Sequence, residues 1–192
     1  MKKKLTKKQQ ELLYKKDLIF RTAIKLFQKY GYDNVSIKDI CNETGISSGS
    51  LYNIYENKAT ILHQFKDSYI EKCYTALCSN LNPENGIQTI IDYIMSLLEA
   101  FNYIGADMTL QLHISHNILF PSNSKGSKIL EGYIDSLKKN NTLKTTLPSS
   151  QCVDMINIIV YGFVYHWCMN ENDVNLIENA KTNLPEMLTF LK

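Results

Sequence analysis

The stretch SIKDICNETGISSGSLYNIYENK (residues 36–58) decides the fold, because it predicts two short helices joined by a tight turn and followed directly by a third helix. Ser36 is a good N-cap, and Asp39 three residues later supplies the acidic half of a capping box. Ser47 repeats this cap at the start of the second helix. Between the helices, Gly45 permits the positive φ that a sharp helix–helix turn requires. This pattern is typical of a DNA-binding helix-turn-helix, whose second helix enters the major groove.

Apolar residues within this stretch predict a small helical core. The two helices are expected over residues 37–43 and 48–54, and Tyr55 is assigned to the core. The seam between the helices is expected to contain Ile40, Ile46, Leu51 and Ile54. The turn pattern alone is a moderate signal, since it also occurs in helical proteins that never touch DNA.

The sequence before this stretch strengthens the interpretation. A capping box that starts at Thr6 predicts a long helix over residues 7–30. Gly31 follows as the residue that ends the helix, and Tyr32 is expected to fold back onto Phe27. A long helix packed against a helix-turn-helix would complete a three-helix domain.

The sequence after it adds a further mark, because the run LYNIY (51–55) leads directly to Asn57 and Lys58, which open the next helix. Between about residues 18 and 62 the chain resembles the tetracycline-repressor (TetR) family of bacterial transcription regulators. The shared marks are the LF…GY end of the first long helix, GIS-x-G, LY-x-x-Y and NK. The resemblance implies a homodimer with an N-terminal DNA-binding domain and a C-terminal helical domain for effector binding and dimerisation.

The resemblance also implies which side chains meet DNA. Bases would be read by residues just inside the start of the recognition helix, where serine can donate or accept and asparagine can pair with adenine. Tyr52 and Lys58 resemble the phosphate contacts of the family, although a half-buried core tyrosine is the alternative for Tyr52. The predicted DNA-binding residues are Ser36, Ser47, Ser48, Gly49, Ser50, Tyr52, Asn53 and Lys58. Because this helix lacks Arg and Lys, we expect specificity to depend on van der Waals fit, DNA shape and water.

Charge is unevenly distributed along the 192 residues. Residues 1–60 carry 12 basic and 6 acidic side chains, a net charge of +6, whereas residues 61–192 carry a net charge of −4. A basic first third suits a phosphate-binding module joined to a domain that does not bind DNA. The first six residues, 1–6, are expected to form a short basic arm.

The remainder of the chain predicts an all-α protein of two domains, since apolar residues recur with helical spacing and Gly and Pro are scarce. The DNA-binding domain is expected to span residues 1–58 and the effector-binding and dimerisation domain residues 59–192. A helix from Lys58 toward Cys78 would link them. Further helices are expected over residues 87–104, 106–119, 125–140, 150–170 and 174–191.

The helix expected over residues 150–170 is apolar almost all the way round, so more than one side of it must be covered. Gly162 in its middle suggests close approach of another backbone, because glycine costs a helix about 1 kcal/mol relative to alanine. Pro185 is expected to kink or restart the last helix. We therefore predict a homodimer through the last two helices, as the resemblance implies.

The composition limits the cell compartment in which the protein is expected and the kinds of chemistry that its residues can support. The five cysteines are odd in number and form no Cys-x-x-Cys, which indicates reduced thiols rather than disulfides or a zinc site. No signal peptide is visible, and the longest apolar run, residues 158–165, is too short to span a bilayer. We expect a cytoplasmic protein without a membrane partner. The sequence has no nucleophile–base set, phosphate loop or paired carboxylates, so it indicates neither an enzyme nor a cofactor.

The C-terminal half is rich in aromatic residues, which core packing explains but which also suit the wall of an effector pocket. The candidate wall residues are Tyr103, His113, His116, Phe120, Tyr161, Tyr165 and Trp167. The two histidines have a spacing that metals tolerate, but no third ligand follows at a telling distance, so we predict no metal site. Few basic residues lie here, so an apolar molecule, neutral or weakly cationic, fits better than a multiply anionic one.

These observations predict a transcription regulator that acts as a repressor and is released from a palindromic DNA operator by a small, largely hydrophobic effector. The alternative is a TetR-like architectural or protein-partnered DNA-binding factor without an effector. A metal-sensing version is a third possibility. A ligand-sized cavity within the C-terminal helices would separate the first two hypotheses.

Overall fold

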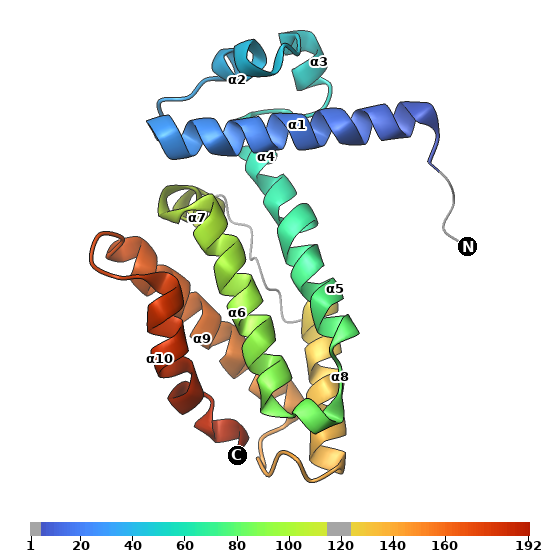
Figure 1. Cartoon of the computed structure of the whole chain (residues 1–192), viewed down its shortest axis with the longest axis vertical. Helices are drawn as coiled ribbons and strands as arrows, with labels where there is room; N and C mark the ends of the chain where they lie inside the picture. Colours follow the sequence, from blue (N-terminus) through green and yellow to red (C-terminus); the bar gives the residue numbers. More distant parts are fainter. Residues whose placement is uncertain (1–4, 115–123) are drawn as a thin grey trace. The chain divides into compact units, whose positions relative to one another are not determined.

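The computed structural model describes residues 5–114 and 124–192, apart from the side chains of residues 66, 67, 113 and 114. Every regular element within the described residues is helical, which confirms the all-α class (Figure 1). The chain divides into two compact units, Met1–Phe65 and Lys66–Lys192. This division lies after the domain boundary expected at residue 58, because the intervening helix packs on the first unit through Ile61, Leu62 and Phe65.

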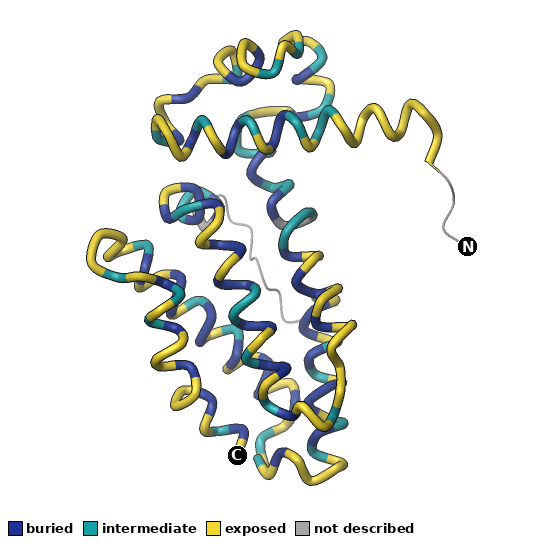
Figure 2. Tube along the Cα trace, viewed as in Figure 1, coloured by how far each residue is buried: buried dark blue, intermediate teal, exposed yellow. Residues whose placement is uncertain are grey.

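The N-terminal unit consists of α1 (Lys7–Tyr30), α2 (Ile37–Thr44), α3 (Ser48–Tyr52) and α4 (Lys58–Phe65). Helix α1 packs against α2 and α4, and its second half supplies most of the core. The first turns of α1 are exposed, as the colours in Figure 2 show. The largest buried side chains of α1 are Ile19, Phe20, Ile24 and Phe27.

The capping residues predicted for α1 and α2 are confirmed. Thr6 forms a capping box at the start of α1, and Gly31 ends that helix with φ +83°. Ser36 forms the second capping box, and Gly45 ends α2 in the left-handed conformation with φ +69°. The chain turns sharply here at a residue that has no Cβ to clash. Helix α3 is shorter than expected, since Asn53 is already its C-cap.

The C-terminal unit forms a bundle in which α6 packs against α5, α9 and α10, while α9 also packs against α7 and α8. Its elements are the π-helical turn η1 (Lys66–Ile70), α5 (Glu71–Ser79), the 3₁₀ turn η2 (Pro83–Asn85), α6 (Ile87–Ile104), α7 (Ala106–Ile114), α8 (Lys125–Lys139), α9 (Ser149–Met169), α10 (Leu176–Met187) and the 3₁₀ turn η3 (Thr189–Leu191).

Two elements differ from the sequence prediction. The helix expected to run unbroken from Lys58 contains a π-helical turn at η1, a feature that is rare and often functional. Pro185 lies inside α10 without ending it at once; the helix continues to Met187, and the chain then tightens into η3. The expected restart after Pro185 is therefore a 3₁₀ turn.

Helix α9 is longer than the apolar run of residues 158–165. Its 21 residues include an 18-residue window with a mean hydropathy of 1.3, so length and composition alone would allow a membrane span. The expectation that no apolar segment is long enough to span a bilayer is therefore wrong for α9 as a whole. Half of that window is buried inside the fold, as is usual for the core helix of a bundle.

Candidate nucleic-acid interface and effector region

Helix α3 presents its first turn to solvent. Leu51 is fully buried and holds the helix against the domain, with Ile40 of α2 in the same core. This anchoring leaves Ser48, Gly49 and Asn53 exposed, and Tyr52 is 56% exposed. Tyr52 is thus not the half-buried core tyrosine of the alternative interpretation. Four of the predicted DNA-binding residues lie together on one accessible surface.

Three serines among the predicted contacts have local roles. The Ser36 hydroxyl donates to the Asp39 carboxylate at 2.6 Å and accepts from the Asp39 backbone N–H at 3.2 Å. Hydrogen bonds from Ser36 hold the pKa of the Asp39 carboxyl below its ordinary value, so a negative charge stays beside Ser36. Ser47 accepts from the backbone N–H of Ser50 at 3.3 Å, and Ser50 is only half-exposed. Free hydrogen-bonding capacity is therefore greatest at Ser48 and Asn53.

Part of the hydrogen-bonding capacity of Lys58 is used within the N-terminal unit. Its ammonium donates to the backbone carbonyls of Tyr32 at 2.6 Å and Val35 at 3.1 Å. The same nitrogen lies 4.1 Å from the centroid of the Tyr32 ring, a favourable cation–π distance. One of its three N–H donors remains for a phosphate oxygen. Sequence reasoning missed this structural role because it depends on where the chain after α1 passes.

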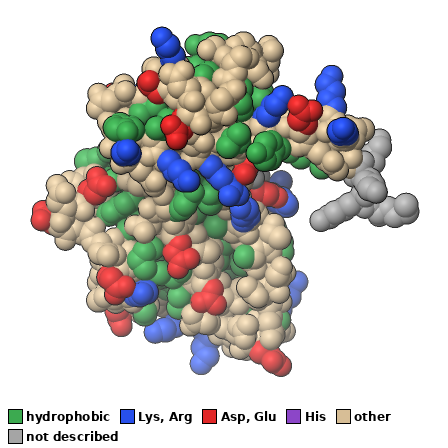
Figure 3. Space-filling model, turned by 45° about the horizontal axis from the view of Figure 1, so that its top comes forward, with side chains coloured by type: hydrophobic (Ala, Val, Ile, Leu, Met, Phe, Trp, Pro, Cys, Tyr) green, Lys and Arg blue, Asp and Glu red, His purple; other side chains and the backbone are tan. Residues whose placement is uncertain are grey.

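Charge on the molecular surface is mixed. On the face shown in Figure 3, Lys and Arg side chains are interspersed with Asp and Glu. Two lysines of the N-terminal unit, Lys25 and Lys38, are exposed on helices α1 and α2. In DNA-binding proteins, exposed lysines of this kind attract phosphates but do not recognise bases.

The predicted effector wall is not brought together as one surface by the described residues. Trp167 is 5% exposed and Tyr161 is half-buried, both on α9. Tyr165 is 64% exposed on the outside of the same helix, which corrects its assignment to an internal wall. Tyr103 is 45% exposed, and its ring stacks on Tyr69 with 4.9 Å between centroids. The side chain of His113, and the whole of His116 and Phe120, lie outside the described residues.

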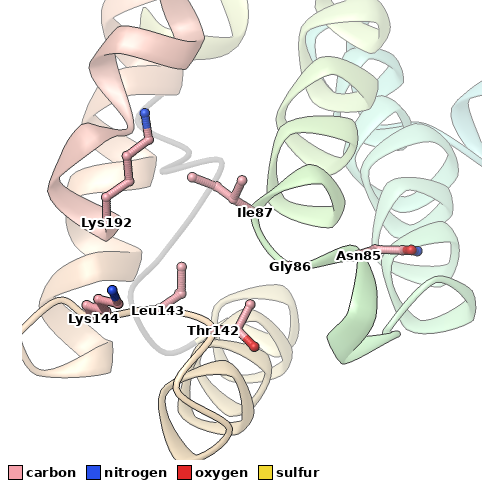
Figure 4. Close-up of a pocket in the computed structure, with 7 residues that line it drawn as sticks. All are labelled: Asn85, Gly86, Ile87, Thr142, Leu143, Lys144 and Lys192. Carbon is pink, nitrogen blue, oxygen red and sulfur yellow. The ribbon is translucent and has the colours of Figure 1, made fainter.

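A pocket of about 430 Å³ lies where the segment before α6 approaches the segment after α8. Figure 4 shows Ile87 and Leu143 facing the space beside Lys192. Its lining residues are Asn85, Gly86, Ile87, Thr142, Leu143, Lys144 and Lys192, none of which belongs to the predicted wall. A second hollow, of about 510 Å³, lies on the N-terminal unit beside Tyr30 and Asp39.

Sequence reasoning left two interior tyrosines out of the candidate site. Tyr74 of α5 and Tyr93 of α6 are 6% and 5% exposed. The available signal was their helical spacing from neighbouring apolar residues, since Tyr74 lies between Ile70 and Leu77 on the buried face of its helix. Among the side chains that the structure describes, no three of His, Cys, Asp or Glu are grouped as metal ligands.

Comparison with known proteins agrees with the geometry of the N-terminal unit. The sequence model of the family described as bacterial regulatory proteins, tetR family, matches residues 19–65. The uncharacterized HTH-type transcriptional regulator YuxN of Bacillus subtilis is 35% identical over 63 residues, which are 33% of this chain and 22% of that protein. The chain thus spans about a fifth of the length of this relative.

Solved structures extend the likeness to the whole fold. A TetR-family transcriptional regulator from Pectobacterium atrosepticum has a TM-score of 0.70 at 16% identity, covering 97% of both chains. FadR of Thermus thermophilus, a TetR-family transcriptional repressor in complex with lauroyl-CoA, has a TM-score of 0.63 at 15% identity. That match covers 92% of this chain and 95% of the Thermus chain.

The described part of the chain is all-helical and forms two compact units, and the first unit contains a helix-turn-helix whose second helix, α3, is exposed. Residues 19–65 thus match the sequence model of the tetR family of bacterial regulatory proteins, and the fold of the chain is that of solved TetR-family regulators.

Proposed function

We propose that this chain is a cytoplasmic transcriptional regulator that represses its target by binding a palindromic DNA operator as a homodimer. The observation that carries the proposal is the exposed first turn of α3, where Ser48, Gly49 and Asn53 project from a helix anchored by the buried Leu51. A short helix held this way can enter a major groove without rearrangement of its domain.

Dimerisation is supported by an exposed apolar face on α9. The α9 stripe comprises Met155, Ile158, Gly162, Tyr165 and Met169, all exposed. Their spacing alternates between three and four residues, which is the spacing of packed helix pairs. A Cβ added to Gly162 would meet no described atom within 4 Å of its own chain. The glycine therefore leaves room for a second copy, and a symmetric contact would place two such helices face to face.

Control by a small, largely hydrophobic effector is supported by the apolar interior of the C-terminal bundle and by the lauroyl-CoA bound to Thermus FadR. The proposed mechanism is a population shift. A ligand that binds one arrangement of the dimer more tightly favours it, and release follows when the two recognition helices no longer match successive major grooves.

Two single substitutions on α3 test the DNA-binding role, because they remove different kinds of contact. Tyr52→Phe deletes one exposed hydroxyl and should weaken operator and random DNA alike, by about three- to tenfold for one lost phosphate contact. Asn53→Ala should instead relax the preference at one operator position, with a loss of about 1–3 kcal/mol there. Competition binding with single-base operator variants measures both effects.

The two variants serve as controls for each other, since both positions are exposed and neither change removes packing. If both variants bind operator DNA with unchanged affinity, α3 is not part of the DNA interface. Equal losses on operator and random DNA for Asn53→Ala would reassign that residue to the phosphate contacts.

A further inference from the structure

The interior of the C-terminal unit contains polar side chains for which the proposed function gives no role. We define the tyrosine cluster as Cys73 and Tyr74 of α5, Tyr93 of α6 and Tyr161 of α9. The rings of Tyr74 and Tyr93 lie 6.3 Å apart between centroids, with 33° between their planes. The charge interaction with Tyr161 adds slightly to the raised pKa of Tyr74. Polar groups from three helices thus meet inside an otherwise apolar bundle.

Most members of the tyrosine cluster have a structural partner. The Cys73 thiol donates to the backbone carbonyl of Ser96 at 3.4 Å. Tyr74 is pressed against Gly126 of α8, where an added Cβ would overlap the ring. Burial raises the pKa of Tyr74, and a hydrogen bond with Ser124 opposes that change. These contacts fix the cluster and explain why polar groups are tolerated there.

The hydroxyl of Tyr93 is different. The residue is 5% exposed, and within the described part of the chain its hydroxyl has no hydrogen-bond partner. Every fully buried side-chain nitrogen or oxygen among the described residues does have one. The Tyr93 oxygen is therefore not fully enclosed, so that water or a ligand atom can reach it. A buried hydroxyl is costly unless such a space supplies a partner.

The surroundings of Tyr93 specify what that partner can be. Burial raises the pKa of the phenol far above its ordinary value, so the group remains a neutral donor. The other groups that act on its ionisation are Tyr74 and Cys73, which are neutral because burial raises the pKa of each. A carboxylate or phosphate placed here would be buried without a counter-charge, which is strongly unfavourable. A neutral acceptor oxygen carries no such penalty.

We propose that the Tyr93 hydroxyl is the hydrogen-bond donor of the effector site, and that this site takes an apolar molecule with a neutral acceptor oxygen, such as an ester or ketone carbonyl. The inference rests on the proposed function, because it names the chemistry of the effector. It goes beyond that function by assigning one residue and by excluding an anionic group at this position.

Tyr93→Phe and Tyr133→Phe form a matched pair for the test, because each removes one oxygen from a buried tyrosine. Tyr133 of α8 is 3% exposed, and its hydroxyl donates to the backbone carbonyls of Asn82 at 2.8 Å and Gly86 at 3.1 Å. Tyr133→Phe should therefore lower the melting temperature, whereas Tyr93→Phe should leave it unchanged or raise it slightly.

The probes are methyl decanoate, decanoate and decane, which share a chain of similar length and differ in the polar group. The full-length wild type should bind methyl decanoate more tightly than either other probe. Tyr93→Phe should bind methyl decanoate about tenfold more weakly, as expected for one buried hydrogen bond, with its decane affinity unchanged. Tyr133→Phe should keep the wild-type preference among the probes.

The assignment is overturned if wild type does not prefer methyl decanoate, if Tyr93→Phe binds it as wild type does, or if Tyr93→Phe loses stability as Tyr133→Phe does. DNA binding without any probe is measured on the same preparations. If the wild type does not bind DNA, the proposed function is contradicted. If DNA binding is intact and Tyr93→Phe binds the probes as the wild type does, only this inference is contradicted.

Discussion

Replacing Gly49 with glutamate is expected to abolish DNA binding and to leave the fold intact. Gly49 is exposed in the first turn of α3, and a Cβ added there meets no described atom within 4 Å. Glutamate forms helices better than glycine by up to about 1 kcal/mol, so the unbound domain should be no less stable. At a DNA interface the new carboxylate would face phosphates and base edges without a partner.

Like charges across an interface cost several kcal/mol, so we expect affinity to fall at least ~100-fold, which corresponds to about 2.8 kcal/mol. Fluorescence anisotropy with operator DNA measures the loss, and circular dichroism checks the fold. Gly132→Glu is the matched control, because Gly132 is an exposed helical glycine of α8 with equally open surroundings. Binding by Gly49→Glu within about threefold of Gly132→Glu would place the DNA interface elsewhere.

Gly162→Glu is expected to convert the dimer into monomers. The substitution puts a charge in the middle of the α9 stripe, and two-fold symmetry doubles it at the contact. An unpaired buried charge costs several kcal/mol, so the dimer dissociation constant should rise by about a thousandfold or more. Within one chain the site is open, so each subunit should still fold.

Sedimentation velocity at micromolar concentration measures this change, with Gly132→Glu again as the control for an added charge. DNA affinity should fall together with dimerisation, since two linked half-sites bind far more tightly than one. A wild type that sediments as a monomer would contradict the proposed dimer. A Gly162→Glu variant that remains dimeric would move the interface away from the α9 stripe.

Local signals explain why the N-terminal unit could be predicted closely from the sequence. The capping boxes of Thr6 and Ser36 and the positive φ of Gly45 depend on residues within one turn of each other. The local sequence specifies such features, whatever the position of the segment in the tertiary structure. The same reasoning located the start of α6 at Ile87 and of α8 at Lys125, because each follows a break rich in polar residues.

Features that depend on distant packing could not be predicted. The commitment of Lys58 to two backbone carbonyls needs the path of the chain after α1. The exposure of Tyr165 and the burial of Tyr93 depend on which faces of α9 and α6 other helices cover. Aromatic composition therefore suggested a pocket wall but could not sort inward from outward tyrosines. The π-helical turn η1 likewise has no signal in the local sequence.

We propose that this chain recognises a palindromic operator through two copies of α3. Selection of bound duplexes from a random-sequence pool, with the full-length wild-type protein, tests this proposal. We expect enrichment of one palindromic site, whose half-sites lie about one helical turn apart or a multiple of it. A pool that shows no enrichment after selection, or that converges on a single site without two-fold symmetry, would contradict it.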